Sequence, residues 1–451
     1  MIDNNEMKAK ALEVPQWLKG GAVYQINPRT FCESGDINGV RKELPFLKSL
    51  GFKTVYLCPI FEEDDSPDRA FWSKRQCASN TNNPKNPYRI NNYFRIDEEY
   101  GSADDLYALV KEAHALDMKV LLDLVYMHIG PHSNLLERHP EFAMRDDEGN
   151  IKYTTFNFPF INFDSEGLRE YLWSNMTYFV GELDVDGFRC DVGDMVPDDF
   201  WVEGRRRIKV IKPDAVLINE GGKFERLSTS FDACYSFEWH NDIMDVLLGK
   251  ITAKQAVEKE KCRQAKVPEN GYLLRDMDNH DTVTDWYTLH QTRVETLAGH
   301  DGMELITVMN YALSGIPMIY CGNELADEAK LSMFANRFYM GEFQVTDREA
   351  MKKTEASARR QSVFTKLNRL LLEKDAMQSA DMEWLDCESR NLIAFKKKGT
   401  EHDIMFACNF GADTEELDLN KTLKDVLMDN LAELDGQKLT LQSHGYILAE
   451  I

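Results

Sequence analysis

Two charged residues, Arg189 and Asp191, close the sequence LDVDGFRCD at residues 183–191. If these residues form an extended strand, Arg189 and Asp191 lie on one face, and Phe188 and Cys190 lie on the other, because side chains alternate along a strand. Taken alone, the charged pair is better explained as a salt bridge at a strand edge. The carboxyl end of a strand is also where an α/β barrel keeps its catalytic groups.

Further polar side chains with catalytic chemistry stand at the ends of other apolar runs, namely Asp123, His128, Glu220, Asn279, His280 and Asp281. The carboxyl ends of parallel barrel strands meet at one face, so we expect these groups to converge on one pocket with Arg189 and Asp191. Carboxylates crowded with arginine and histidine donors suit glycoside hydrolysis. There, one ionised carboxylate meets an oxocarbenium-like centre and a protonated one assists the leaving group.

Eight apolar, strand-like runs must position these groups, at residues 21–27, 52–60, 119–128, 183–191, 214–220, 231–237, 271–279 and 315–324. Buried strands that alternate with amphipathic helices predict a parallel sheet covered on both faces. Eight such units predict a closed (β/α)8 TIM barrel, an α/β fold. A doubly wound open sheet is the alternative, although no glycine-rich phosphate loop follows an early strand.

Helix signals separate the strands. Residues 102–118 are predicted to form a helix with Ser102 as its N-cap residue. They carry acids in the first turn and repeat apolar residues at helical spacing. An earlier helix ends at Gly51, and residues 165–183 and 354–372 also read as helices. Residues between the second strand and Gly101 are predicted to form a long polar loop.

Changes of pattern divide the chain into four segments. Residues 1–128 and 165–375 are predicted to form the two parts of the catalytic barrel. Between them, residues 129–164 are polar and aromatic without helical period, which predicts a small domain inserted after the third strand. Short alternating runs at residues 376–451 predict a C-terminal antiparallel, β-sandwich-like domain.

The composition restricts the classes of partner and the cellular compartment that we expect for this protein. A formal charge of −23 over 451 residues argues against nucleic acid and anionic membrane partners and suits neutral solutes. Nine scattered cysteines show neither metal-binding spacing nor a disulfide framework, and residues 1–10 lack an apolar signal core. We therefore expect a cytoplasmic protein with no membrane span, and leave its oligomeric state open.

Several motifs together resemble one enzyme family. They are DLVYMH (123–128), DGFRCD (186–191), INE (218–220) and DNHD (278–281), joined by GIPMIYCGNE (315–324), NPYRINNYFRIDEEYGS (86–102) and GDINGV (35–40). In order and spacing the set resembles the α-amylase family of glycoside hydrolases, which are retaining (β/α)8-barrel enzymes active on α-glucans. The resemblance runs from about residue 23 to residue 324 and continues into a β domain.

The resemblance implies a role for each matching residue. Asp191 would be the nucleophile, Glu220 the general acid/base and Asp281 the stabiliser of the transition state. Substrate-binding residues would be Tyr88, Asp123, His128, Arg189 and His280, with Tyr88 stacking under the sugar ring in the cleavage site. In line with these roles, we expect Arg189 to lower the pKa of Asp191 and neighbouring acids to raise the pKa of Glu220.

The chain departs from the family pattern at three positions. Met127 stands where many members have an asparagine that binds calcium, and a thioether is a poor ligand for a hard cation, so we expect neither calcium nor another cofactor. Asp194 and Met195 replace a Lys-His pair that many amylases use beyond the cleavage site. Recognition of a long polymer is therefore not expected from this segment.

The function predicted from the sequence is retaining hydrolysis of α-glucosidic bonds, most readily α-1,4, in malto-oligosaccharides or related α-glucans. A transglycosylase or sugar phosphorylase would use the same site, with a sugar hydroxyl or phosphate in place of water. A non-catalytic carbohydrate-binding member of the fold is a third reading, and Asp191, Glu220 and Asp281 argue against it.

The substitution at Met127 generates a first prediction. Because it removes an oxygen ligand, EDTA should leave both activity and melting temperature nearly unchanged. Activity assays and thermal unfolding with and without the chelator measure this. A drop of many degrees that added calcium reverses would contradict the prediction.

Overall fold

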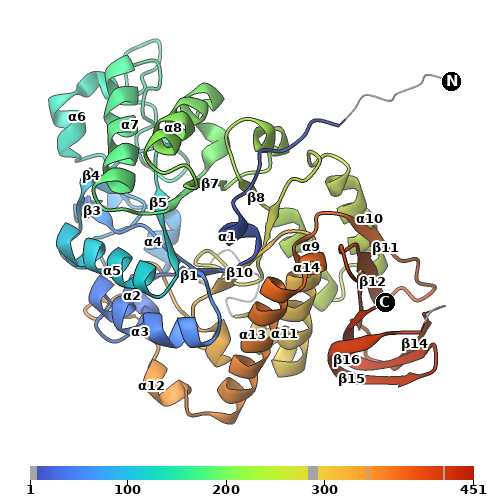
Figure 1. Cartoon of the computed structure of the whole chain (residues 1–451). Helices are drawn as coiled ribbons and strands as arrows, with labels where there is room; N and C mark the ends of the chain where they lie inside the picture. The colour runs from blue at the N-terminus through green and yellow to red at the C-terminus, as the bar shows by residue number, and fades with distance from the viewer. Residues whose placement is uncertain (1–7, 283–292, 342, 344, 420–421) are drawn as a thin grey trace.

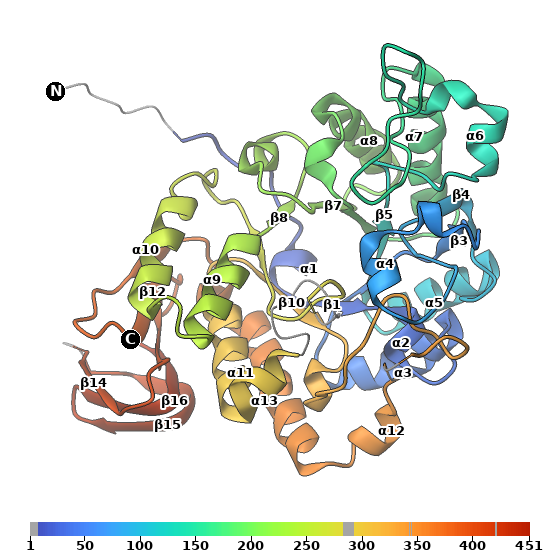
Figure 2. The same ribbon diagram turned by 180° about the vertical axis from the view of Figure 1, so that it is seen from behind.

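The computed structural model describes residues 8–282, 293–341, 343, 345–419 and 422–451. It consists of a central barrel, two excursions from the barrel and a C-terminal sheet (Figure 1). The insertion that carries α6 and the C-terminal sheet lie at opposite ends of the molecule in both ribbon views (Figure 2).

Eight parallel strands close into the barrel in the order β1-β10-β9-β8-β7-β6-β5-β2. Their bounds are β1 Val23–Ile26, β2 Thr54–Leu57, β5 Lys119–Leu124, β6 Gly187–Cys190, β7 Val216–Asn219, β8 Ala233–Tyr235, β9 Leu273–Arg275 and β10 Ile316–Tyr320. Each strand lies within one of the eight predicted runs, so the barrel is confirmed and the open sheet is wrong. The run at residues 183–191 is extended only from Gly187, because Asp184 adopts a left-handed conformation with φ of 58°.

The barrel interior is filled in layers by inward-facing side chains. Val23, Leu121, Val216 and Leu274 form one apolar cluster inside it, and Leu18 from α1 (Gln16–Lys19) belongs to the same cluster. The predicted site residues Asp123 and Arg189 lie toward the carboxyl ends of β5 and β6, as a barrel with its site at that end requires.

Helices surround the barrel, and their ends follow the predicted capping signals. The longer ones are α3 Ile37–Ser49, α5 Ala103–Ala115, α7 Glu166–Gly181, α8 Asp198–Ile211, α9 Phe237–Leu247, α10 Ala253–Gln264, α11 Val294–Ala312 and α13 Glu355–Glu373. Short helices are α2 Pro28–Phe31, α12 Arg348–Met351 and α14 Asp375–Gln378, with 3-10 turns η3 Gly193–Met195, η4 Phe224–Ser228 and η5 Asn323–Leu325. Ser102 caps α5 in a capping box with Asp105, and Gly51 follows α3 with φ of 88°.

The predicted long loop before Gly101 is wrong. This excursion, residues 61–100, contains the antiparallel pair β3 (Phe61–Glu63) and β4 (Ile90–Ile96), the helix α4 (Lys74–Ala78) and the turn η1 (Arg69–Phe71). Register shifts interrupt the pairing, so the buried residues of β4 are spaced by three instead of two. The strand therefore lacks the alternation by which a strand is recognised in a sequence.

The second excursion, residues 129–164, leaves the barrel after β5 and returns at Ser165, which caps α7. It carries the short helix α6 (Asn134–Arg138), the turn η2 (Pro140–Phe142) and isolated bridges such as the one between His128 and Phe160. Most of its backbone is irregular, as the absence of helical period indicates.

The C-terminal segment is antiparallel, as predicted. Its strands are β11 Met382–Trp384, β12 Leu392–Lys397, β13 Ile404–Asn409, β14 Glu415–Asp418, β15 Asp425–Asp435 and β16 Lys438–Glu450. All six belong to one hydrogen-bonded sheet, in which β16 pairs with β13, β14 and β15. Phe395, Phe406 and Tyr446 on one face join the main hydrophobic core, which continues into the helices of the barrel.

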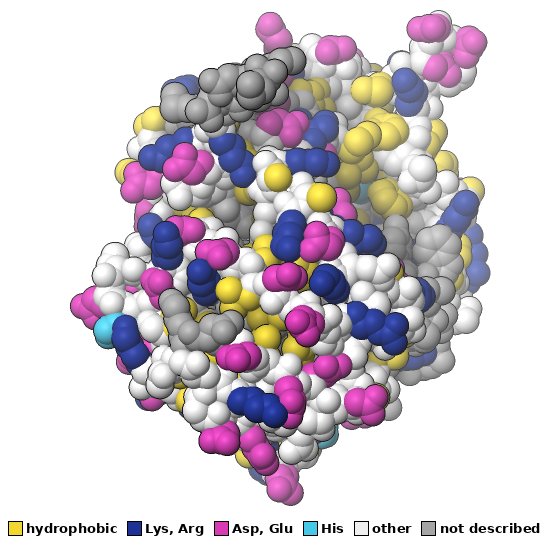
Figure 3. All heavy atoms as spheres, turned by 90° about the vertical axis from the view of Figure 1, so that its right-hand side faces the viewer, with side chains coloured by type: hydrophobic (Ala, Val, Ile, Leu, Met, Phe, Trp, Pro, Cys, Tyr) yellow, Lys and Arg dark blue, Asp and Glu magenta, His cyan; other side chains and the backbone are white. Residues whose placement is uncertain are grey.

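The surface and the cysteines agree with the composition. Acidic and basic side chains are interspersed over the face shown in Figure 3. All nine cysteines are free thiols. Among the helices of the described residues, none combines the length and the apolar character that a membrane crossing requires.

The start of β6 generates a second prediction. Gly187 has φ of 146°, and an added Cβ would lie 2.2 Å from the carbonyl oxygen of Val216. Gly187→Ala should therefore push β6 from β7 and lower the free energy of unfolding by about 3 kcal/mol, as a drop in melting temperature will show.

Gly249→Ala is the matched control. Gly249 also has a positive φ, 67°, but nothing lies within 4 Å of the added carbon. Its substitution should cost only about 1 kcal/mol of backbone strain. Equal drops in melting temperature for the two variants would contradict the steric explanation.

Candidate active site

The predicted site residues converge at the carboxyl end of the barrel strands. Asp123 lies on β5 and Arg189 on β6, and the register of the two strands pairs them directly. Asp191 follows β6 and Glu220 follows β7. His280 and Asp281 come from the segment after β9. Parallel register thus brings together residues that are far apart in the sequence.

Arg189 lies at the centre of this group and is 1% exposed. Its Nη1 lies 2.7 Å from Asp123 Oδ1 and 3.0 Å from Asp191 Oδ1, and its Nη2 lies 2.6 Å from Glu220 Oε1. One buried guanidinium therefore bridges three carboxylates. The predicted position of Arg189 and Asp191 on one strand face is confirmed by their direct contact.

A tight turn after β6 holds the two central acids in place. Val192 adopts a left-handed conformation with φ of 42°, and its backbone N–H donates to Glu220 Oε2 at 2.7 Å. The N–H of Asp191 donates to the carbonyl of Leu124 at 2.9 Å. Asp191 Oδ2 is buried without a hydrogen-bond partner among the described residues, which leaves this oxygen to meet a ligand.

The expectation of a lowered pKa at Asp191 is wrong. Burial has the largest effect and raises the pKa of Asp191 well above its ordinary value; Arg189 lowers it, and the neighbouring carboxylate of Glu220 raises it. One guanidinium shared among several buried acids does not compensate for the water they have lost.

The pKa of Glu220 is raised, as predicted. Burial raises its pKa to about 7, against the opposing effect of Arg189. Asp281 adds a further increase through its negative charge. Because Asp191 and Glu220 share one cation, the pair retains a proton near neutral pH.

Asp281 differs from both. Burial alone would raise its pKa, but His280 and Arg75 lower it by more, and the carboxyl stays ionised. Arg75 Nη1 contacts Asp281 Oδ1 directly. Burial also lowers the pKa of His280, so this imidazole is neutral at pH 7, and within the described part of the chain the positive charge that remains beside Asp281 is that of Arg75.

The rings of Tyr88 and His280 stack beside the acids, with centroids 5.6 Å apart and planes at 17°. Gln25 Oε1 accepts from the backbone N–H of His280 at 3.3 Å, so Gln25 Nε2 donates to His280 Nδ1 at 2.8 Å. The proton of the neutral ring is therefore on Nε2, which lies 2.6 Å from the Tyr88 hydroxyl. Tyr88 in turn donates to Asp123 Oδ2 at 3.0 Å.

His128 lies behind this layer. Its Nε2 donates to the backbone carbonyl of Tyr88 at 2.8 Å, and burial lowers its pKa to about 4. His128 is thus a neutral ring that holds Tyr88, and its substrate-binding role stays a prediction. Asn279 accepts from the backbone N–H groups of Asp281 and Thr282 and shapes the turn that presents Asp281.

Three contributors to the site were missed in the sequence. Gln25 and Tyr56 are polar groups inside predicted strands, and their polarity within apolar runs was a usable signal; Tyr56 donates to Asp123 Oδ2 at 2.6 Å. Arg75 lies on α4, in the segment for which the sequence predicts a loop. Nothing in its local sequence indicates that it contacts Asp281.

Asp194 forms hydrogen bonds with the segment around Glu220. Its carboxylate accepts from Asn219 Nδ2 at 2.8 Å and from the backbone N–H groups of Gly222 at 2.7 Å and Lys223 at 3.1 Å. It thereby clamps the segment that follows Glu220. A Cβ at Gly221 would lie 2.3 Å from this carboxyl, so the close approach requires glycine there.

The surroundings of Met127 do not fit a calcium ion. The side chain is 5% exposed and belongs to the main hydrophobic core. Within the described ranges, no three or more His, Cys, Asp or Glu side chains gather as a metal site would require. That the protein needs no metal stays a prediction.

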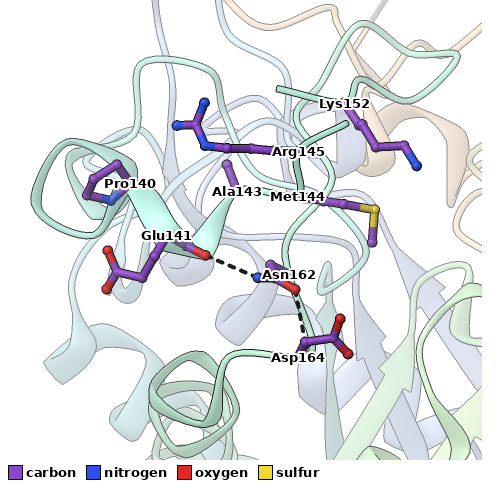
Figure 4. A pocket seen from close by; sticks show the side chains of 8 residues that line it. All are labelled: Pro140, Glu141, Ala143, Met144, Arg145, Lys152, Asn162 and Asp164. Carbon is purple, nitrogen blue, oxygen red and sulfur yellow. Dashed lines mark hydrogen bonds between the residues drawn. The ribbon is translucent and has the colours of Figure 1, made fainter. Parts of the chain in front are cut away.

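A separate depression of about 770 Å³ lies on the second excursion (Figure 4). Its lining includes Glu141, Met144, Arg145, Lys152, Asn162 and Asp164. Asn162 donates to the backbone carbonyl of Glu141, which ties its two sides together. None of the predicted site residues lines this depression.

Comparison with known proteins gives a family match. A family model described as the alpha amylase catalytic domain matches residues 15–149 and 141–391. A cyclomaltodextrinase from a Bacillus species is 27% identical over 362 residues, 69% of this chain and 60% of that protein. A maltogenic alpha-amylase from Bacillus acidopullulyticus is 26% identical over 368 residues, 70% of this chain and 58% of that protein. The alignments thus span about three fifths of these relatives.

Solved structures share the fold over nearly the whole chain. An alpha-amylase from Lactobacillus plantarum has a TM-score of 0.78 and 24% identity, covering 97% of this chain and 100% of that one. A noncanonic maltogenic alpha-amylase from Thermotoga neapolitana has a TM-score of 0.79 and 22% identity, covering 96% and 99%. At these identities the likeness concerns the fold, including the C-terminal sheet.

Proposed function

The chain belongs to the α-amylase family, and from this premise we propose that it is a retaining glycoside hydrolase that cleaves α-glucosidic bonds in malto-oligosaccharides or related α-glucans. The α-1,4 bond is the most suitable substrate bond. The names of the relatives, a cyclomaltodextrinase and a maltogenic alpha-amylase, support small α-glucans as the substrate class.

The single observation that carries the mechanism is the bridge formed by Arg189. Because its two terminal nitrogens contact Asp191 Oδ1 at 3.0 Å and Glu220 Oε1 at 2.6 Å, the two carboxyls lie close together. Retaining enzymes keep their carboxyls about 5 to 5.5 Å apart, whereas inverting enzymes leave about 6.5 to 9.5 Å for a water molecule. The bridge therefore favours retention.

In the first step, Asp191 Oδ2 attacks the anomeric carbon while Glu220 gives its proton to the departing glycosidic oxygen. The products are a glycosyl ester on Asp191 and a free sugar hydroxyl. In the second step, Glu220 takes a proton from water, the water oxygen attacks the anomeric carbon, and the ester bond to Asp191 breaks. Two inversions leave the α configuration unchanged.

The protonation states suit this sequence. With a pKa of about 7, Glu220 holds the proton that the leaving group needs. Placing the shared proton on Glu220 leaves Asp191 ionised for attack, because their like charges disfavour ionisation of both acids. Asp281, ionised beside Arg75, would face the positive charge that develops on the sugar.

The remaining residues bind the sugar. Tyr88 is half-buried and offers its ring as a platform, and Asp123, His128 and His280 are proposed to bind hydroxyl groups around it. A cytoplasmic location and independence from calcium also remain predictions.

Removal of the nucleophile is the decisive test. Asp191→Asn should lower kcat by roughly 10³-fold or more, because no covalent ester forms. The melting temperature should not fall, since the change removes one negative charge from a crowded group of acids. Assays on maltoheptaose and an aryl maltoside, together with thermal unfolding, measure both effects.

Asp184→Asn is the matched control. Asp184 precedes the same strand, and its side chain is 53% exposed, remote from the pocket. It should retain activity. Near-normal turnover by Asp191→Asn, or β-anomer as the first product in an NMR time course, would contradict the assignment. Products that form only with added phosphate or sugar acceptors would instead favour a phosphorylase or transglycosylase.

The pKa of Glu220 predicts the pH dependence. Above its pKa of about 7, Glu220 loses the proton required by the leaving group, so kcat/KM on malto-oligosaccharides should fall as the pH rises through that value. Glu220→Gln should lose this limb, and should retain its first step on a glycosyl fluoride, whose leaving group needs no proton. A rate that is constant from about pH 6 to 8 would contradict this role.

A further inference from the structure

Arg75 is a residue of the first excursion that reaches into the catalytic group. It lies on α4, whose position is shown in Figure 2. Its Nη1 contacts Asp281 Oδ1, and its Nη2 donates to the backbone carbonyls of Asp281 at 2.9 Å and His280 at 3.3 Å. The guanidinium is largely buried, with a side-chain exposure of 12%. One forked cation thus holds both the carboxylate and its backbone.

The helix that presents Arg75 is itself well anchored. Ser73 caps α4 by accepting from the N–H of Gln76, and the Gln76 side chain, 1% exposed, donates to the carbonyl of Asn83 at 3.0 Å. Asn83 donates in turn to the carbonyl of Phe334 at 3.0 Å. Arg75 therefore stands on a fixed support.

The other charged groups near Asp281 do not replace its contact with Arg75. Arg189 is shared by Asp123, Asp191 and Glu220, and it acts on Asp281 only from a distance. The adjoining imidazole of His280 is neutral at pH 7 because burial lowers its pKa. Among the residues that the structure describes, Arg75 is thus the cation in direct contact with the Asp281 carboxylate.

The contact also orients the carboxylate. Arg75 engages Oδ1, and Oδ2 lies 3.5 Å from Nε2 of His280. Rotation of the carboxylate would break the ion pair, while a shift of the turn would break the bonds from Arg75 to the backbone carbonyls. Both degrees of freedom are therefore restrained by the same side chain.

We propose that Arg75 is a positioning residue for the reaction, which keeps Asp281 ionised and oriented toward the sugar in the cleavage site. This inference rests on the proposed function. Arg75 acts through Asp281, so its removal should affect the transition state more than the binding of the substrate.

The test compares Arg75→Ala and Arg75→Lys with the control Arg69→Ala. Arg69 is an exposed arginine of the same excursion that packs over Trp72 and donates to the side chain of Asn82. Arg75→Ala should lower kcat at least about tenfold with a smaller change in KM, as expected when an interaction made mainly in the transition state is lost.

The pH profile separates positioning from a purely structural role. Among the described residues, the groups that act on Asp281 include His280, Arg75 and Arg189, with Glu220 and Asp191 as neighbouring acids. Without the nearby cation, burial should raise the pKa of Asp281, so protonation of Asp281 should add to the acid limb of kcat/KM and move that limb to higher pH. Arg75→Lys should restore the limb by returning the charge, while its single ammonium leaves kcat below the wild-type value.

A cycle of melting temperatures tests the ion pair independently of activity. The drops caused by Arg75→Ala and Asp281→Asn should be less than additive in the double variant. Additive drops would overturn the proposal, as would a wild-type kcat and acid limb in folded Arg75→Ala. Inactivity of the wild-type protein on α-glucans would count against the proposed function, and additivity would then still decide whether Arg75 holds Asp281.

Discussion

The buried guanidinium of Arg189 is the interaction on which the site depends. Removing several carboxylates from water is costly, and their mutual repulsion adds to the cost. Arg189 offsets part of it by contacting Asp123, Asp191 and Glu220 at once. Because the compensation is incomplete, the acids keep a proton, and this shortfall is what supplies an acid at neutral pH.

A closed barrel is what makes such a cluster stable. Register pairs Asp123 with Arg189 on adjacent strands, and the next strand delivers Glu220 to the same level. Below them, the apolar layer that includes Leu121 and Val216 fills the interior and excludes water. The rigid packing of these strands holds the carboxylates close together despite their mutual repulsion.

The first excursion and the segment after β6 complete the group of site residues by different means. The first excursion supplies Tyr88 and Arg75, so both the proposed sugar platform and the cation beside Asp281 depend on the correct folding of this excursion. After β6 and β7, Asp194 holds the segment following Glu220 through backbone hydrogen bonds. Asp194 stands where the resemblance implied a lysine beyond the cleavage site, and its carboxylate instead makes internal contacts.

The sequence by itself determined the barrel and its principal acids. Eight apolar runs, separated by capped helices, allow few arrangements other than a parallel barrel, and the chemistry at a strand end is visible because Asp191 or Glu220 interrupts an apolar pattern. Gln25 and Tyr56 likewise interrupt apolar runs.

Only the tertiary structure decided how these groups act on one another. The pKa of Asp191 depends on the balance between burial and a cation shared with two other acids, so the spacing of Arg189 alone predicted the wrong direction. Register shifts in the pairing of β4 remove the alternation of buried residues, so the sequence predicts a loop where the structure has this excursion. Arg75 lies 206 positions from Asp281, and local patterns hold no information on a contact across that separation.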